Sequence, residues 1–278
     1  MNPLGLEYLT VYGCHPLDTV RIAADIGCSH LTFFTQAVDF PGMPPHPPSL
    51  FDDARLRKEV MAALDDHGLT IALIDGFGFA SAEGAKAAAL RAQLDIMCEL
   101  GVTRVNTSST LEWGATIDKV GTLADLVGEY GMMLTIEAIP TYTIGDLPSA
   151  LAVLREVNQP HLKLLIDTMH IARTGGAQLL TEIDPALIGY VQICDGPAGM
   201  PSGEVYFDEA LHQRLIPGEG ELPLVEMMAA IPEHIIASME VPLRSLREKG
   251  VSDAERARLS AVGSLKVLKA AAARRAAA

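Results

Sequence analysis

Four polar side chains interrupt apolar segments in the second half of the chain. They are Glu137 in LTIEAIP, Asp167 in KLLIDTM, Gln192 in YVQICD and Glu240 in IIASMEV. Each segment reads as a buried strand, where an unpaired charge or amide is costly. A shared cation would remove that cost. Because three carboxylates and one amide oxygen suit hard divalent ions, the residues predict a site for Mn²⁺ or Mg²⁺, with Co²⁺ or Zn²⁺ as the other choices.

The same residues allow a purely structural interpretation. The carboxylates could pair with arginines or cap neighbouring loops, although few Arg or Lys residues occupy corresponding positions. His170 follows Asp167 by three residues. It could contact a substrate, or it could only donate a hydrogen bond that orients a ligand. Asp195 could likewise orient a neighbour or form a structural pair.

Short apolar runs alternate with longer amphipathic segments along nearly the whole chain, a pattern typical of βαβ units. The expected strands are residues 6–12, 30–36, 70–78, 104–109, 133–140, 162–170, 188–195 and 234–242. No Gly-x-Gly-x-x-Gly follows any of them, so a closed barrel is favoured over an open doubly wound sheet. We predict a single (β/α)8 TIM barrel domain over residues 1–278, with a last helix that begins at Ser252 and frays near 270–278.

Barrel enzymes build their active sites at the carboxyl ends of the strands. Two long excursions leave such ends, residues 37–50 and residues 196–221. The first is proline-rich and forms either a rigid lid beside the site or a contact in a homo-oligomer. Trp113 and Phe77 follow the fourth and third strands. They are candidates for an aromatic wall around a small substrate, or for ordinary packing.

Composition excludes several classes of partner. The net charge is −14, with 35 acidic against 21 basic residues, which disfavours nucleic acid and anionic membrane surfaces. No apolar run is long enough to predict a membrane span. The four cysteines have no Cys-x-x-Cys spacing, and the start MNPLGLEYLT lacks the pattern of a signal peptide. These features favour a cytoplasmic protein that acts on a small molecule.

The order of the polar residues resembles that of the xylose isomerase-like superfamily. The resemblance lies in IEAIP, IDTMH, VQICD, RLIPGEGEL and MEVP, between residues 135 and 242. The superfamily contains sugar epimerases, inosose dehydratase, 3-dehydroshikimate dehydratases and endonuclease IV. It implies that Glu137, Asp167, Gln192 and Glu240 ligate the metal. It also implies that His170 lines the substrate site and that Arg214 is the loop arginine that grips a substrate.

Two reactions are compatible with this resemblance. The first is isomerisation or epimerisation of a sugar or polyhydroxylated ketone through an enediolate, with Glu137 and Glu240 as general base and general acid. The second is dehydration of a cyclic 3-oxo compound, in which His170 protonates the leaving hydroxyl. Gln192 agrees with 3-dehydroshikimate dehydratases, whereas sugar epimerases carry His there. A barrel without catalysis, serving as a binding or scaffold protein, is the third hypothesis.

Each reaction also meets a departure in the sequence. Thr143 stands where sugar epimerases carry a glutamate, six residues after the ligand on the fifth strand. The segment LIDGFGFA after the third strand lacks the arginine that the dehydratases use for a substrate carboxylate. Endonuclease IV would need several further histidines at strand ends, and together with the acidic charge this argues against DNA repair.

Overall fold

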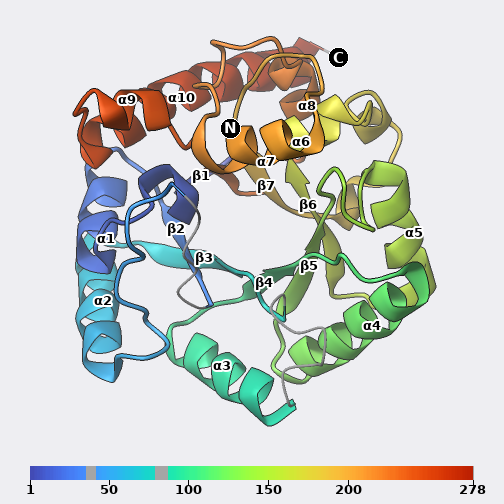
Figure 1. Cartoon of the computed structure of the whole chain (residues 1–278), viewed down its shortest axis with the longest axis horizontal. Coiled ribbons are helices and arrows are strands. Elements are labelled where there is room, and N and C mark those ends of the chain that lie inside the picture. Colours follow the sequence, from blue (N-terminus) through green and yellow to red (C-terminus); the bar gives the residue numbers. More distant parts are fainter. Residues whose placement is uncertain (36–41, 79–86, 278) are drawn as a thin grey trace.

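Eight parallel strands close into a barrel, each hydrogen-bonded to the next, with β8 returning to β1. The structure is a computed structural model, and it describes residues 1–35, 42–78 and 87–277. Figure 1 shows the strands at the centre and the helices around them. The strands are β1 (Leu4–Leu6), β2 (His30–Phe34), β3 (Thr70–Asp75), β4 (Arg104–Thr107), β5 (Met133–Glu137), β6 (Leu162–Asp167), β7 (Ile188–Ile193) and β8 (Ala237–Met239). The predicted (β/α)8 barrel is confirmed.

The strands are connected by helices that pack on the outside of the barrel. The α-helices are α1 (Pro16–Asp25), α2 (Ala54–His67), α3 (Ala87–Glu99), α4 (Trp113–Glu129), α5 (Leu147–Val157), α6 (Thr168–Arg173), α7 (Gly203–His212), α8 (Leu224–Ala230), α9 (Arg244–Glu248) and α10 (Asp253–Ala277). The described residues also form the short 3-10 helices η1 (Tyr8–Val11), η2 (Leu179–Thr181) and η3 (Pro185–Leu187). No helix among the described residues is long and apolar enough to cross a membrane.

Local sequence explains where several of these helices begin and end. The Asp53 carboxylate accepts hydrogen bonds from the first backbone amides of α2, which ends at Gly68 in a left-handed conformation. Asp146 and Ser149 form a reciprocal capping box at the start of α5. Such capping signals are short-range, so they are recognisable in the local sequence.

The largest difference from the predicted elements lies at the first strand. Residues 6–12 were expected to form it, but β1 covers Leu4–Leu6 and the following residues form η1. The reason is a tertiary contact: the Thr10 hydroxyl donates to Met239 O at 2.6 Å and accepts from Val241 N at 2.8 Å. These bonds hold η1 against the end of β8.

Helix α4 begins at Trp113, and α10 is helical to Ala277, the last described residue. Arg275 anchors the end of α10 by donating to Ile231 O at 3.0 Å. The long segment after β7 contains an unpredicted helix, α7. Of the proline-rich loop, residues 37–41 lie outside the described part of the chain.

The parallel arrangement brings the chemistry-bearing residues to one rim. Glu137 and Asp167 are the last residues of β5 and β6, Gln192 is the penultimate residue of β7, and Glu240 directly follows β8. Asp167 and Gln192 are register partners in adjacent strands. Asp75 ends β3 and joins the same rim. The barrel thereby places the predicted site at the carboxyl ends of the strands.

Candidate metal centre and active site

Glu137, Asp167 and His170 form a buried group that could hold a metal ion. Their ligand atoms all lie within 4.8 Å of one another. His170 Nε2 is 3.5 Å from Glu137 Oε1 and 3.7 Å from Asp167 Oδ2. The sequence interpretation assigned His170 to the substrate, but its Nε2 atom lies equally close to the two carboxylates. His170, through its nitrogen, and Gln192, through its amide, are therefore alternative ligands of the proposed metal.

Gln192 adjoins this group through Glu240. Its Nε2 atom donates to Glu240 Oε1 at 3.1 Å. Its Oε1 atom is buried and has no hydrogen-bond partner among the described residues. A buried acceptor without a donor is destabilising, and a cation at this oxygen would satisfy it. This oxygen without a hydrogen-bond partner is the observation that supports the fit of these side chains to a divalent ion.

Arg214 lies between two of the proposed ligands. Its Nη1 atom is 2.6 Å from Asp167 Oδ2, and its Nη2 atom is 2.8 Å from Glu240 Oε2. The Nε atom donates to Ala210 O at 2.8 Å, which fixes the guanidinium against α7. Arg214 lies after α7 and not at a strand end, and it provides the pairing with an arginine that the structural interpretation allowed. Because Arg214 is far from its partners along the chain, only the fold reveals the pairing.

One guanidinium does not neutralise the whole cluster. Burial raises the pKa of Glu137 well above its usual value, and the charges of Asp75 and Asp167 raise it further. Burial likewise raises the pKa of Glu240, although Arg214 opposes the shift. Burial also acts against the charge of Asp167, but the charge of Arg214, together with the hydrogen bonds from Arg214 and from the His170 amide and the influence of the His170 ring, outweighs it and the pKa falls. A further positive charge would therefore be favourable here.

Tyr206 on α7 orients the His170 ring. Its hydroxyl hydrogen-bonds to His170 Nδ1, which leaves Nε2 directed at Glu137 and Asp167. Burial lowers the pKa of His170 to about 4, so the imidazole is neutral near pH 7. Sequence reasoning missed Tyr206, because nothing in the segment after β7 indicated which of its side chains points inward.

Helix α7 is itself locked onto the barrel. Arg173 of α6 donates from Nη1 and Nη2 to the two carboxylate oxygens of Glu209, both at 2.7 Å. This bidentate pair holds the helix that carries Tyr206 and precedes Arg214.

Asp195 has a structural role in the neighbouring loop. Its carboxylate accepts hydrogen bonds from the backbone amides of Gly218, Gly220 and Leu222 at 2.9, 3.0 and 3.2 Å. It shapes the Pro-Gly-Glu-Gly turn, and the described structure gives it no contact with His170.

The polar cluster opens into a cavity of about 160 Å³ at the barrel rim. Its polar lining includes Asp75, Glu137, His170, Arg214 and Glu240, and Phe34 and Tyr142 supply aromatic surface. Of the aromatic candidates from the sequence, Phe77 is fully buried in the core and Trp113 is half-buried at the start of α4. Neither lines this cavity. Their spacing after the strand ends did not specify on which side of the loop each ring packs.

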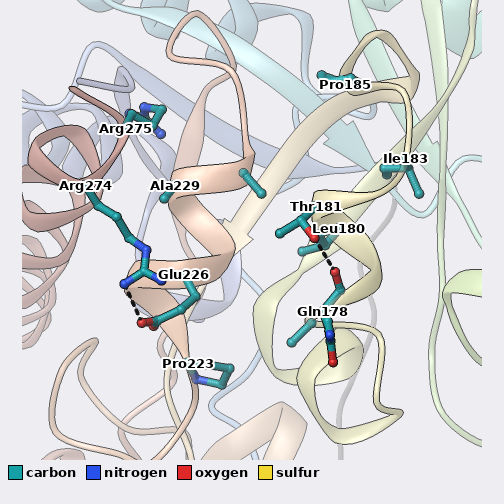
Figure 2. Close-up of a pocket in the computed structure, with 12 residues that line it drawn as sticks. Gln178, Leu180, Thr181, Ile183, Pro185, Pro223, Glu226, Ala229, Arg274 and Arg275 are labelled. Carbon is teal, nitrogen blue, oxygen red and sulfur yellow. Dashed lines mark hydrogen bonds and ion pairs between the residues drawn. The ribbon is translucent and has the colours of Figure 1, made fainter. Parts of the chain in front are cut away.

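A larger cavity, of about 570 Å³, lies elsewhere, between η2, η3, α8 and the end of α10. Figure 2 shows its lining, in which Arg274 forms an ion pair with Glu226 at 3.0 Å. None of the candidate catalytic residues reaches it. The smaller cavity at the barrel rim, which Glu137, His170 and Glu240 line, is therefore the candidate active site.

Comparison with known proteins identifies the family. The family described as xylose isomerase-like TIM barrel matches residues 18–262. The chain belongs to this family. No curated protein sequence matched the chain.

Solved structures resemble this xylose isomerase-like barrel over nearly its full length. The IOLI protein with a bound zinc atom superposes with a TM-score of 0.78 at 16% identity, over 96% of this chain and 98% of that one. A probable 3-DHS dehydratase, AsbF from Bacillus anthracis, gives 0.69 at 17% identity, over 92% and 97%. D-psicose 3-epimerase in the presence of D-fructose gives 0.68 at 14% identity, over 96% and 99%. At these identities the similarity establishes the fold and not the reaction.

Proposed function

We propose that this protein is a divalent-metal-dependent isomerase or epimerase of a sugar or polyhydroxylated ketone. The observation that carries the proposal is that Glu137 and Glu240 line one cavity together with His170 and Arg214. The two glutamates come from β5 and from the end of β8, three strands apart in an eight-stranded barrel. They can therefore approach a bound substrate from different sides.

The metal would be held by Glu137, Asp167, Gln192 and Glu240, with His170 as the alternative to Gln192. A divalent ion supplies Lewis-acid stabilisation to a substrate oxygen that becomes negative when the adjacent C–H proton is removed. The neighbour that carries zinc supports a divalent ion in this fold. We propose Mn²⁺ or Mg²⁺ because oxygen atoms dominate the ligand set.

The side chains of the cavity divide the remaining work. Glu137 takes the proton from the carbon next to the carbonyl, and Glu240 returns a proton from the other side of the substrate. Arg214 Nη2, beside Glu240, donates to a substrate oxygen. His170 donates from Nε2 when its Nδ1 accepts from Tyr206.

A lyase that dehydrates a cyclic 3-oxo substrate is the second candidate. The position of His170 favours it, because its ring lines the cavity, where an Nε2–H can donate a hydrogen bond to a leaving hydroxyl. One structural neighbour is titled a probable 3-DHS dehydratase. The two reactions share the first proton abstraction and differ in whether water leaves.

Incubation in D2O with Mn²⁺ separates the two candidates. Cyclic and linear hydroxy-ketones are supplied, and deuterium is followed by NMR while absorbance reports conjugated products. Deuterium in recovered substrate or epimer without loss of water supports isomerisation. A conjugated enone or aromatic product supports dehydration. If no hydroxy-ketone exchanges deuterium, the proposed reaction is wrong.

Metal analysis tests the centre itself and the third possibility, a barrel without catalysis. Purified protein is expected to hold about one divalent ion per chain, and Glu137→Gln is expected to reduce this content. Glu204→Gln, an exposed glutamate on α7, is the matched control. A protein that binds no divalent ion, and whose metal content and stability do not respond to Glu137→Gln, would exclude the centre.

A further inference from the structure

Asp75 is an acidic residue of the cavity that is not one of the proposed metal ligands, although Asn106 links it to Glu137. It ends β3, and its side chain lines the cavity at the barrel rim. In a closed barrel of eight strands in sequence order, β3 lies across the barrel from β7, which carries Gln192. A substrate that is anchored at Gln192 and Glu240, on the β7 and β8 side, and passes Glu137 therefore extends its other end toward Asp75. Sequence reasoning passed over this residue and noted only that its segment lacks an arginine.

Asn106 holds Asp75 in place. The Asn106 Nδ2 atom donates both to Asp75 Oδ1 at 3.0 Å and to Glu137 Oε2 at 3.1 Å. Thr135 Oγ1 lies 3.0 Å from Asn106 Oδ1 as a hydrogen-bond donor, which turns the amide nitrogen toward the carboxylates. The Gly76 amide also donates to Asp75 Oδ1, at 2.6 Å. The described hydrogen bonds of Asp75 thus all fall on Oδ1, and the carboxylate is rigidly positioned.

The surroundings of Asp75 determine what it can bind. Among the described residues it has no ion-pair partner, in contrast to Asp167 and Glu240, which share Arg214. A carboxylate that accepts hydrogen bonds at one oxygen can accept a hydroxyl or an ammonium group at the other. A second carboxylate brought beside it would meet like-charge repulsion in a partly dry cavity.

We infer that Asp75 is a specificity-determining residue that accepts a hydrogen bond from a hydroxyl at the far end of the substrate and rejects a carboxylate there. The inference rests on the proposed function and refines its substrate class to ketones whose distal end is an uncharged polyol. Asn106 acts as a positioning residue, because it acts on the substrate only through Asp75 and Glu137.

A pair of matched probes tests this assignment. D-fructose and D-fructuronate share the ketone end and differ at carbon 6, which is a hydroxymethyl group in the first and a carboxylate in the second. Dissociation constants are measured by ligand-observed NMR with Mg²⁺ at pH 8, for the wild type, Asp75→Asn and the control Asp66→Asn. Asp66 is exposed at the end of α2, far from the cavity.

The wild type is expected to bind D-fructose at least about tenfold more tightly than D-fructuronate. This factor corresponds to the usual contribution of one hydrogen bond to a charged group. Asp75→Asn should reduce this preference at least about fivefold, whereas Asp66→Asn should preserve it. An unchanged preference in Asp75→Asn overturns the inference, and so does wild-type protein that binds D-fructuronate as well as D-fructose or fails to bind D-fructose.

A measurement on the wild type alone guards against a variant that does not fold. 6-Amino-6-deoxy-D-fructose carries an ammonium group at the same end, and it should bind at least as tightly as D-fructose. Weaker binding of the amine than of the uronate contradicts the inference. Deuterium exchange reports the reaction separately: exchange without a preference at carbon 6 removes the role of Asp75 and leaves the proposed reaction. A preference for D-fructose without deuterium exchange keeps the role of Asp75 and removes the proposed reaction.

Discussion

Arg214 donates from Nη1 to Asp167 Oδ2 at 2.6 Å, and both side chains are almost completely buried. The same guanidinium reaches Glu240 Oε2 at 2.8 Å. It supplies positive charge at the place where the proposed metal would bind. The cluster can therefore be stabilised by the arginine, by a cation, or by both.

Replacing Arg214 by alanine should make the stability of the protein depend on metal. Without added metal, Arg214→Ala should lower the free energy of unfolding by about 3–5 kcal/mol, because buried carboxylates lose their partner. Saturating Mg²⁺ should recover more stability in the variant than in the wild type. Urea unfolding with and without Mg²⁺ measures both effects.

Arg244→Ala is the matched control for that experiment. Arg244 forms a partly exposed ion pair with Asp208 at 2.6 Å. Its loss should cost about 1 kcal/mol or less, and Mg²⁺ should not restore it. Equal losses in the two variants would show that the buried pair contributes no more than an exposed one.

Removing the Tyr206 hydroxyl should impair turnover more than stability. Tyr206→Phe keeps the ring but leaves His170 Nδ1 without its described partner. We expect kcat to fall about 10-fold or more, and the free energy of unfolding to fall by about 1 kcal/mol. Tyr130→Phe, whose exposed hydroxyl is 3.1 Å from Asp95 Oδ1, should leave kcat unchanged. Steady-state kinetics across pH measures the effect, and an unchanged kcat and pH profile in Tyr206→Phe would remove the orienting role.

Glu7 should make the protein less stable as the pH rises. Burial raises the pKa of Glu7 to about 7, against an unfolded-state value of 4.5, although hydrogen bonds from Thr32 and Tyr190 oppose the shift. The folded state then holds the proton to higher pH than the unfolded state. Its contribution is fully present below pH 4.5 and is lost as the pH rises through about 7.

Glu7→Gln tests that pH dependence, because glutamine keeps the shape without titrating. We compare the free energy of unfolding of the variant with that of the wild type at each pH. The variant's advantage should be larger at pH 8 than at pH 5 by roughly 3 kcal/mol or less, since one pKa unit corresponds to about 1.4 kcal/mol. Urea unfolding at the two pH values provides the comparison, with exposed Glu204→Gln as control. If the free energies of unfolding of Glu7→Gln and of the wild type differ by the same amount at both pH values, the prediction is wrong.

Gln192 should contribute to metal affinity through its orphaned oxygen. Gln192→Leu removes that oxygen while keeping similar volume, and it should weaken Mn²⁺ binding at least about tenfold. Gln192→His provides a ligand nitrogen and should retain more of the affinity. Calorimetric titration of the metal-free proteins gives the constants. If the Gln192→Leu variant and the wild type bind Mn²⁺ equally well, His170 is the better candidate for the fourth ligand.

The strand pattern and the candidate ligands were accessible from the sequence. Buried strands of a parallel barrel are short and nearly continuously apolar, so an embedded Glu137 or Asp167 stands out from its neighbours. Parallel strands all end at the same rim, which is why the order of strands alone was enough to predict that these residues meet. Boundaries were less accessible: η1 replaces most of the first expected strand because Thr10 contacts β8.

The tertiary structure alone decided which side chains complete the cluster. Arg214 and Tyr206 lie in and after a helix of a long loop, and the path of that loop depends on the pairing of Arg173 with Glu209. Asp75 faces the cavity while Phe77, two residues later, is buried in the core. The sequence by itself determined the barrel and the residues whose burial requires a partner, because periodicity and composition are local. Which partner each one meets depends on barrel closure and loop packing, which join residues far apart in the chain.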